Sequence, residues 1–481
     1  MKRCVLFLLR VSPLLVAAVV AGCTSVPRGA GFGAVQRTVA ERAGAEVRWY
    51  QNAALDGEAT AAVAALLGDT LQVDEAVQVA LLNNRRLQAT YERLSIAQAD
   101  LVQAGLLRNP VFGAGALWSL AEAEPPDLAF SVAFDFLGLL TRPLRRAVAA
   151  AAFEAEQAHV TDAVLRIVVG VQAAHTEAVA AQQAVELLTA VTQATALSAQ
   201  TMRRLFDAGN VTRLELLEER ALHEQTRLDL DAATAEGVLA RERLTRLLGL
   251  TGPAATAYRL PQRLPPVPRD SLASQARALS DLEAEAVAQS LALDAQRHAL
   301  DAAAQRLGLA DATALVGDLE AGAELEREEG RWELGPEVHL PLPLFDQGQA
   351  RRAAADAEVR RLRADYYAQA AEVRSVARAA RERLLVAQRR ALHLQEVVLP
   401  LRLDITEQTQ RQYNAMQVGT FRLLLAKQQE IDAARQTVAA LAAYWQARAA
   451  VDALRAGHLP DVPAALSPAS TAVRAMAVDD H

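Results

Sequence analysis

The stretch LAFSVAFDF, residues 128–136, together with the helical pattern that follows it, decides the fold. Its even positions, from Leu128 to Phe136, are all large and apolar, whereas the odd positions carry Ala, Ser, Ala and Asp. A period of two places alternate side chains on opposite faces of an extended chain. The stretch is therefore predicted to be a strand with one apolar face.

A very long helix is predicted directly after this strand. Thr141 and Pro143 are typical of an N-cap and a first helical position, and the sequence from Arg145 to Ala208 contains no proline. About 65 helical residues at about 1.5 Å each would be about 100 Å long. Helices in globular domains average about three turns, so a rod of this length predicts an elongated protein.

The composition supports an extended helical architecture. Only 4% of the 481 residues are aromatic, and long segments are rich in Ala and charged residues. The net charge is −7, and no basic patch with interleaved aromatic residues occurs, so nucleic acid is not an expected partner. We find no run of eighteen apolar residues after the N-terminus and therefore expect no transmembrane helix in the mature chain. A membrane crossing would use strands.

Residues 1–22 are typical of a targeting segment, with Lys2 and Arg3 followed by an apolar run. The sequence VAGC at residues 20–23 resembles a bacterial lipobox, which implies cleavage before Cys23 and lipidation of Cys23. The absence of Asp after Cys23 favours the outer membrane, by resemblance to lipoprotein sorting. A plain secretory signal is the alternative. Cys4 leaves with the signal, so the mature chain is expected to contain no disulfide.

The first half of the mature chain follows a simple order. Residues 23–69 are expected to be an irregular N-terminal arm. The first repeat, residues 70–249, is predicted to contain a helix over 70–107 capped by Thr70, strands at 111–119 and 128–136, the long helix, a reversal at Gly209 and a returning helix that ends at Gly249.

The second half repeats this order after a Pro-rich connector, residues 250–273. The second repeat, residues 274–457, is predicted to contain a helix over 274–309, strands at 313–325 and 337–345, and a helical run over 350–418 that is interrupted by Pro400 and ends at Gly419. Asp135 with Asp346, Gly209 with Gly419, and Gly249 with Gly457 are separated by similar intervals, which predicts a tandem duplication. The tail, residues 458–481, is expected to be disordered.

Four strands cannot close a barrel, and an open hydrogen-bonding edge cannot face lipid. The chain is therefore expected to form an oligomer. Three copies would supply twelve strands, enough for a barrel with a lumen, and their helices would form a coiled-coil tube.

Several motifs resemble the TolC family of trimeric outer-membrane efflux factors. They are RNPVF (108–112), AGNVTRLELLEE (208–219), LTRLLG (244–249), PLPLFDQGQARR (341–352) and QVGTFRLLLAKQQEIDAAR (417–435). The resemblance covers residues 71–457. It implies a mostly α fold with a small β part: a twelve-stranded outer-membrane β-barrel continued by a periplasmic α-helical barrel, formed by a homotrimer. It also implies a periplasmic adaptor (a membrane fusion protein) and an inner-membrane pump, of the RND kind, as partners.

No enzymatic constellation is found in the sequence, and no cofactor is expected. The eight histidines show no paired metal-ligand spacing, and there is no HExxH, phosphate-binding glycine loop or nucleophile elbow. We therefore interpret the histidines as surface or packing residues and predict neither catalytic nor metal sites.

Acidic residues concentrate on the predicted non-lipid side of the strands. They are Asp135, Asp318, Glu320, Glu324, Glu326 and Glu337. A water-filled lumen needs only polar residues of any sign, but no Lys or Arg shares these positions before Arg327. The pattern predicts that these carboxylates face the pore and favour cations.

The two helical reversals carry the remaining candidate residues. Gly209 and Gly419 are expected to adopt positive φ at the helix ends. The resemblance implies that the adaptor docks on these glycines and on their apolar neighbours Leu205, Val211, Leu214, Val418 and Phe421. Family members close the tip with aspartates after the second glycine, where this chain has Leu425 and Gln428. Glu215 and Glu218 occupy the matching positions after Gly209 and are the candidate gate.

The predicted function is the outer-membrane channel of a tripartite efflux system that exports small toxic compounds or metal ions. The channel of a type I protein secretion system and a non-conducting coiled-coil scaffold lipoprotein remain alternatives. Strands with a lipid face argue against the scaffold, whereas the substrate class is not encoded in any motif that we recognise.

Overall fold

A computed structural model describes residues 26–27, 29, 31–50, 53–118, 126–269, 272–314, 319–328 and 331–460. The predicted signal peptide, Cys23, Asp318 and the tail after Pro460 lie outside the described residues. The chain divides into two compact units. Unit 1 comprises residues 1–51, 85–164 and 291–369, and unit 2 comprises residues 52–84, 165–290 and 370–481.

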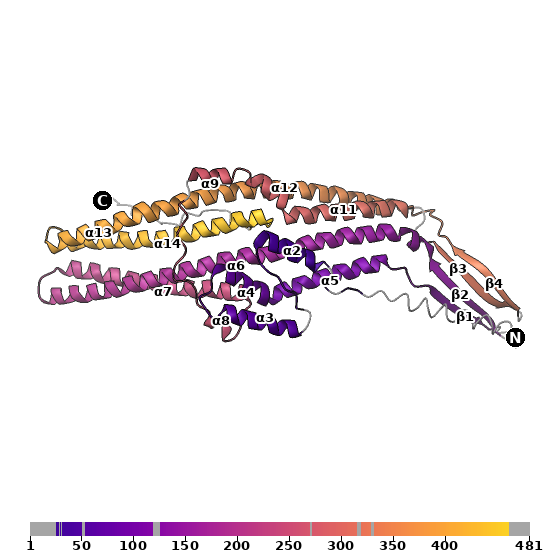
Figure 1. The fold of residues 1–481 in the computed structure, drawn as a ribbon, viewed down its shortest axis with the longest axis horizontal. Coiled ribbons are helices and arrows are strands. Elements are labelled where there is room, and N and C mark those ends of the chain that lie inside the picture. The colour runs from indigo at the N-terminus through magenta and orange to yellow at the C-terminus, as the bar shows by residue number, and fades with distance from the viewer. Residues whose placement is uncertain are drawn as a thin grey trace, which may run out of the picture. The chain divides into compact units, whose positions relative to one another are not determined.

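Unit 1 contains the sheet and the helices beside it (Figure 1). Its elements are α2 (Phe32–Ala43), α5 (Arg85–Gly105), β1 (Val111–Leu117), β2 (Asp127–Asp135), the first part of α6 (Phe136–Asp207), α11 (Leu291–Ala312), β3 (Glu320–Glu328), β4 (Arg331–His339) and the first part of α12 (Gln349–His393).

The named elements of unit 2 are all helical, and its described residues also include the non-helical connector after Tyr258, where Arg259 forms an isolated bridge with Thr70. Its elements are α3 (Ala53–Leu66), α4 (Val73–Asn83), the rest of α6, α7 (Arg213–Leu248), α8 (Ala254–Ala257), α9 (Leu272–Ala278), α10 (Leu282–Gln289), the rest of α12, the π-helical turn η1 (Leu394–Val398), α13 (Leu399–Asn414) and α14 (Thr420–Ala456).

The four strands form one antiparallel sheet in the order β1-β2-β3-β4. β2 takes the predicted position, and Phe130 pairs with Ala114 of β1 and Leu325 of β3. Cross-strand partners share a face, so the period-two pattern of β2 extends over the whole sheet. The alternation predicted around residues 321–325 is confirmed: Ala321, Ala323 and Leu325 pair with Phe134, Val132 and Phe130.

The predicted bounds of the third and fourth strands are wrong. β3 begins at Glu320, because α11 continues to Ala312 and Thr313 lies in a turn. β4 is Arg331–His339, where we expected the turn, and residues 340–345 are not a strand. We expected the segment EREEGRWELGP, residues 326–336, to be a turn, but an edge strand tolerates the proline at the end of this segment. Pro341 and Pro343 then end the extended pairing.

The predicted start of the long helix is also wrong. α6 begins at Phe136, immediately after β2, and includes Pro143. The Oδ1 atom of Asp135 accepts a hydrogen bond from the amide of Gly138 at 2.6 Å. Asp135 thus caps α6, and the Thr141 hydroxyl donates to the carbonyl oxygen of Leu137 inside the helix.

The two shorter predicted helices are broken. α4 and α5 are separated at Asn84, and Gln72 with Glu75, not Thr70, forms the capping box of α4. The helix predicted over 274–309 is divided into α9, α10 and α11, with a break at Ser290. The Asn84 side chain caps the C-terminal end of a different helix, α7, because its Nδ2 atom donates to the carbonyl oxygen of Leu247. The N-terminal arm also differs from the irregular segment that we expected, because it contains α2 and α3.

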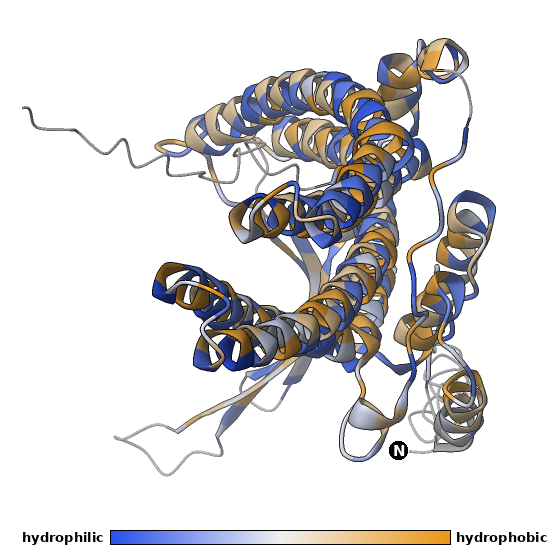
Figure 2. Cartoon of the chain, turned by 90° about the vertical axis from the view of Figure 1, so that its left-hand side faces the viewer, coloured by the Kyte–Doolittle hydropathy of each residue, from blue (hydrophilic) through white to orange (hydrophobic). Residues whose placement is uncertain are grey.

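Small and β-branched residues form the cores of the long helical pairs. Ala433 and Ala440 of α14 are buried. In unit 2, the Thr195 and Thr226 hydroxyls of α6 and α7 lie 2.9 Å apart. Figure 2 shows apolar and polar residues alternating along the helices, as expected for narrow packing stripes. One window of α6 is long and apolar enough for a membrane span by length and composition, but half of it is buried as in the core helix of a soluble protein.

The second long helical run is interrupted as predicted near Pro400. α12 passes into η1 and then into α13, whose first turn contains Pro400. Proline lacks the amide proton that an α-helical hydrogen bond requires. The π-helical turn lies immediately before it, a widening of the kind that accommodates such a defect within a helix.

Candidate functional site

One face of the sheet, here called the apolar face, exposes large hydrophobic side chains. Phe112, Phe134, Leu334 and Val338 are each more than half exposed. The rings of Phe112, Phe130 and Trp332 are stacked in sequence across the sheet, with centroids 6.3 and 6.2 Å apart. Exposed apolar surface of this extent usually marks a contact with a partner or a membrane.

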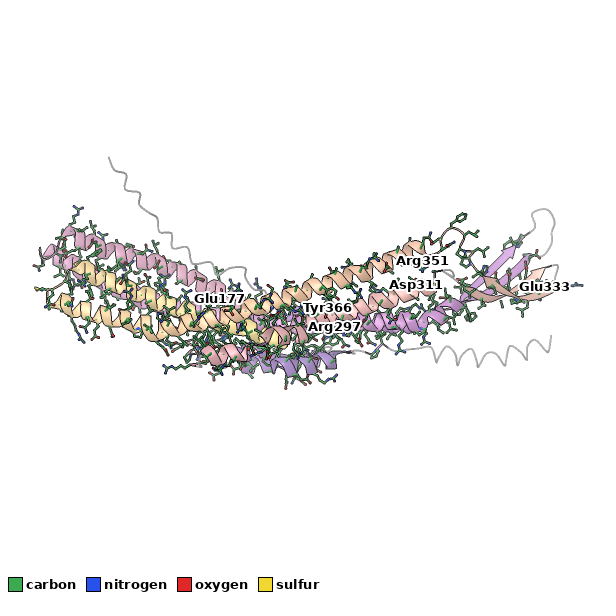
Figure 3. The ribbon with its side chains drawn as sticks, turned by 90° about the horizontal axis from the view of Figure 1, so that it is seen from above. Glu177, Arg297, Asp311, Glu333, Arg351 and Tyr366 are labelled. Atoms are coloured by element: carbon green, nitrogen blue, oxygen red, sulfur yellow. The ribbon has the colours of Figure 1, made fainter. Side chains whose placement is uncertain are left out.

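The opposite face, here called the acidic face, carries a concentration of carboxylates. The register places Glu326 directly opposite Glu333, and Glu320 opposite Asp135. Glu333 lies on β4 in Figure 3. The carboxylates of this face whose side chains are described are Asp127, Asp135, Glu320, Glu324, Glu326, Glu333 and Glu337. Like charges that face each other across two strands destabilise a sheet. The stability of the sheet therefore does not explain why these carboxylates are placed together.

The sheet brings together most of the predicted pore residues. Glu320, Glu324, Glu337 and Asp135 share the acidic face, as expected. Asp135 also caps α6 and lies 3.6 Å from Nε of Arg108. The sequence analysis missed Asp127 and Glu333, because Glu333 lies in the segment that we interpreted as a turn. Arg331 and His339 also lie on this face, and Nε2 of His339 is 2.6 Å from Oε1 of Glu337. Arg327 lies on the apolar face over the Trp332 ring.

The first tip, residues 208–212, joins α6 to α7 in unit 2. Gly209 has φ 76°, as predicted. Its amide donates to the carbonyl oxygen of Phe206, and the amide of Asn210 donates to Leu205, each at 2.9 Å. These two bonds form a Schellman motif. Thr212 is the N-cap of α7 and forms a capping box with Glu215. The Thr212 hydroxyl accepts a hydrogen bond from the Glu215 amide, and the Glu215 carboxylate accepts one from the Thr212 amide.

The second tip, residues 415–419, joins α13 to α14. Gly419 does not have positive φ: its φ is −80° and it is the N-cap of α14, so this prediction is wrong. Met416 takes the left-handed conformation, with φ 57°. The amides of Met416 and Gln417 donate to Tyr413 and Gln412, each at 2.9 Å. Met416 therefore corresponds to Gly209, and Gly419 corresponds to Thr212.

The Glu215 side chain connects the two tips. Its Oε1 atom accepts a hydrogen bond from the Thr420 hydroxyl at 3.3 Å. The backbone amide and the hydroxyl of Thr212, and then the Thr420 hydroxyl, hold the pKa of Glu215 below its usual value. Glu215 is therefore engaged in holding the helix start. Of the other two carboxylates in this turn of α7, Glu218 is half-buried and Glu219 is buried.

The tips also expose apolar side chains. Leu214 is 65% exposed and Phe421 is 64% exposed, whereas Leu205, Val211 and Val418 are half-buried. Met416 is 95% exposed, and the sequence analysis missed it because no glycine marks its position.

The histidines include one that is clearly a packing residue. The Nε2 atom of His175 lies 2.8 Å from the carbonyl oxygen of Leu71, to which it donates, and burial lowers the pKa of the ring. Among the residues that the structure describes, no three His, Cys, Asp or Glu side chains are grouped to hold a metal ion.

Comparison with solved structures gives extensive matches. The outer membrane protein VceC of Vibrio cholerae matches with a TM-score of 0.67 and 17% identity, over 81% of this chain and 97% of that chain. The outer-membrane channel OprN matches with a TM-score of 0.65 and 18% identity, over 80% of this chain and 90% of that chain. The CmeC outer membrane channel of Campylobacter jejuni matches with a TM-score of 0.68 and 14% identity, over 80% of this chain and 86% of that chain. No protein-family profile and no curated protein matches the sequence.

These likenesses span both units and the sheet. The chain has the fold of the TolC-family outer-membrane efflux channels. The resemblance inferred from the tip and strand motifs is confirmed at the level of the fold. In the TolC fold of this chain, the two-faced sheet and the two tips lie in different units, so they are separate candidate sites.

Proposed function

We propose that this chain is the outer-membrane channel of a tripartite efflux system, which exports small toxic compounds or metal ions to the exterior. The observation that carries the proposal is the two-faced sheet. An apolar face with stacked aromatic rings suits lipid, and an acidic face suits a water-filled lumen. The likeness to solved channels supports the same assignment.

The chain acts as a homotrimer in this proposal. β1 and β4 are the edges of the sheet, and an edge within lipid would leave backbone polar groups unpaired. Three copies, pairing β1 of one with β4 of the next, would close twelve strands. The helical parts would continue the barrel into the periplasm as a coiled-coil tube.

An internal duplication accounts for the recurrence of elements. Gly249 and Gly457 both end long helices in the left-handed conformation, with φ 68° and 92°. Asn84 and Ser290 both end α4 and α10 with extended backbone. The spacing from Gly249 to Gly457 supports the tandem repeat, whereas Gly209 and Gly419 are no longer equivalent landmarks.

The tips dock the periplasmic adaptor, a membrane fusion protein, which connects the channel to an inner-membrane pump of the RND class. Leu214 and Phe421 support this assignment by their exposure, together with Gly209, Gly419 and the half-buried Leu205, Val211 and Val418. Glu215 is committed to the capping box, so the acidic gate, if formed from α7, depends on Glu218.

Cys23 anchors the mature chain to the outer membrane by its lipid, with the barrel as the second attachment. A Cys23→Ala variant should lose the acyl label and the processed size. Incorporation of labelled palmitate into the wild type and the variant alike would contradict lipidation at Cys23.

The channel proposal is tested by single-channel recording in planar bilayers. The wild type should conduct and prefer cations, and Glu320→Lys, Glu324→Lys and Glu337→Lys together should reverse that preference, because nine side chains of a trimer change sign on the acidic face. Asp100→Lys, Asp301→Lys and Glu372→Lys, on helices, are the control for net charge. An inserted wild type that passes no current would favour the scaffold alternative.

A reversal in the control as well would place the preference in the total charge and not in the sheet. Export assays then separate the transport classes. Cells expressing the channel with an RND pump and its adaptor should survive toxic compounds or metal ions, whereas secretion of a protein with an ABC exporter would favour the type I alternative.

A further inference from the structure

A cavity of about 220 Å³ lies within unit 2, and neither the sheet nor the tips contribute to it. Four segments line it: the start of α4, the middle of α6, the connector at residues 261–265 and the C-terminal half of α14. An apolar cavity of about 150 Å³ accommodates benzene. This cavity is therefore large enough for one substituted aromatic ring.

The connector is fixed over the cavity from two sides. The indole N–H of Trp445 donates to the carbonyl oxygen of Pro265 at 2.9 Å. The amide of Leu264 donates to Oε1 of Gln183 at 3.2 Å. These bonds hold the connector to α14 and α6, so the cavity is formed before any ligand arrives.

The apolar part of the lining suits a flat ring. Val179 and Leu264 are buried, and Trp445 presents the edge or face of its indole to the same space. Aromatic rings gain contact energy beyond area burial when they stack or meet edge to face. A planar aromatic ligand would use this wall better than a branched aliphatic one of the same volume.

The charges around the cavity leave one cation uncompensated. Arg448 pairs with Asp452 at 3.0 Å, so these two side chains cancel. Arg263 also lines the cavity and has no carboxylate partner among the described residues. The lining therefore carries a formal charge of about +1, since a buried imidazole such as that of His175 stays neutral near pH 7.

We propose that this cavity binds a small aromatic monoanion, with its ring against Trp445, Val179 and Leu264 and its carboxylate on the guanidinium of Arg263. Arg is the residue that holds a carboxylate with two parallel hydrogen bonds. The proposal does not depend on the channel function, because it uses neither the sheet nor the tips.

Salicylate is the probe for the test, and the purified full chain is the sample. Isothermal titration calorimetry should show one site per chain, and the tryptophan fluorescence of the chain should change on binding because Trp445 lines the cavity. Arg263→Gln should weaken salicylate binding at least tenfold, because it removes the uncompensated charge. Arg269→Gln is the matched control: Arg269 lies outside the lining and pairs with Glu396, so binding should be unchanged.

A second comparison separates charge from ring binding. Salicylamide, which has the same ring without the negative charge, should bind the wild type as weakly as salicylate binds Arg263→Gln. Circular dichroism verifies that each variant is folded. Equal salicylate binding by Arg263→Gln and Arg269→Gln, equal binding of the amide, or no heat at millimolar salicylate would each overturn the proposal.

Discussion

The two tips have the same backbone and different chemistry. Five residues join the helices in each case, 208–212 and 415–419. Each tip has a residue in the left-handed conformation, followed by a six-to-one hydrogen bond. Glycine occupies the left-handed position of the first tip and the N-cap of the second. The reversal is thus fixed by backbone geometry, and a glycine in it can occupy either the left-handed position or the N-cap.

The difference has an energetic consequence. The first tip combines glycine at the left-handed position with a Thr–Glu capping box, which are both preferred choices. The second tip places Met416 in a conformation that costs an L-residue roughly 1–2 kcal/mol, and its N-cap has no side chain. We therefore expect the second tip to open more readily than the first.

Replacing each glycine by alanine should give the largest contrast. Gly209→Ala should destabilise the first tip by about 1–2 kcal/mol, because the added Cβ is strained at φ 76°. Gly419→Ala should cost less, roughly 0.5–1 kcal/mol, because a Cβ is not strained at φ −80° although alanine is a poorer N-cap than glycine. Hydrogen exchange of the tip amides measures both. An added Cβ meets no atom within 4 Å at either site, so neither substitution introduces a steric clash.

If the two alanine variants exchange equally faster than the wild type, the equivalence of the two glycines that the sequence suggested is correct and the structural assignment is wrong. Both variants should keep the helical content of the wild type, because neither added Cβ meets another atom within 4 Å.

The sequence predicted the helical pairs and the faces of the sheet well, because apolar residues recur in these segments at the period of a helix or of a strand. β2 lies as predicted, and Ala321, Ala323 and Leu325 face as predicted. The errors occur where a local signal has two structural explanations. Pro336 lies in the segment that we expected to be a turn but belongs to an edge strand. Thr141 was interpreted as the N-cap of the long helix, whereas Asp135 performs that function six residues earlier.

One candidate site could likewise be predicted from the sequence, and part of the other could not. The acidic face could be predicted because residues two apart on a strand share a face. The equivalence of Gly209 with Met416 could not, since left-handed conformation in a non-glycine residue has no sequence signature. The likeness of Gly209 and Gly419 led the alignment of the repeats astray by three residues.

Relieving the strain of the second tip should stabilise it. Met416→Gly should slow the exchange of the amides around residues 415–418 by the equivalent of about 1 kcal/mol, because glycine adopts positive φ without a steric penalty. Met416→Ala is the control, since alanine keeps the strain and removes only the exposed side chain. A similar gain from both variants would attribute the effect to the exposed thioether chain and not to φ.

Exchanging the N-cap residues of the two tips should change helix stability less than the substitution of Met416, and in opposite directions at the two helices. Thr212→Gly should destabilise the start of α7 by a few tenths of a kcal/mol, and Gly419→Thr should stabilise the start of α14 by a similar amount. Protection factors of the first-turn amides of the two helices provide the measurement. A loss at both starts would show that Gly419 has a requirement other than capping, such as close approach of an adaptor.

The smallest expected effect is a pH dependence confined to the first tip. The amide and hydroxyl of Thr212, and then the Thr420 hydroxyl, lower the pKa of Glu215 from its usual 4.5. A lowered carboxyl pKa adds stability that is complete above pH 4.5 and is lost as the pH falls through the pKa of the folded state. Protection at the first tip, corrected for intrinsic exchange, should therefore decline in acid, and Glu215→Gln should remove the decline. Arg422 occupies the matching position at the second tip, whose protection should stay constant over this range. An equal decline at both tips would assign the effect to the acidification of the whole chain and not to the capping box.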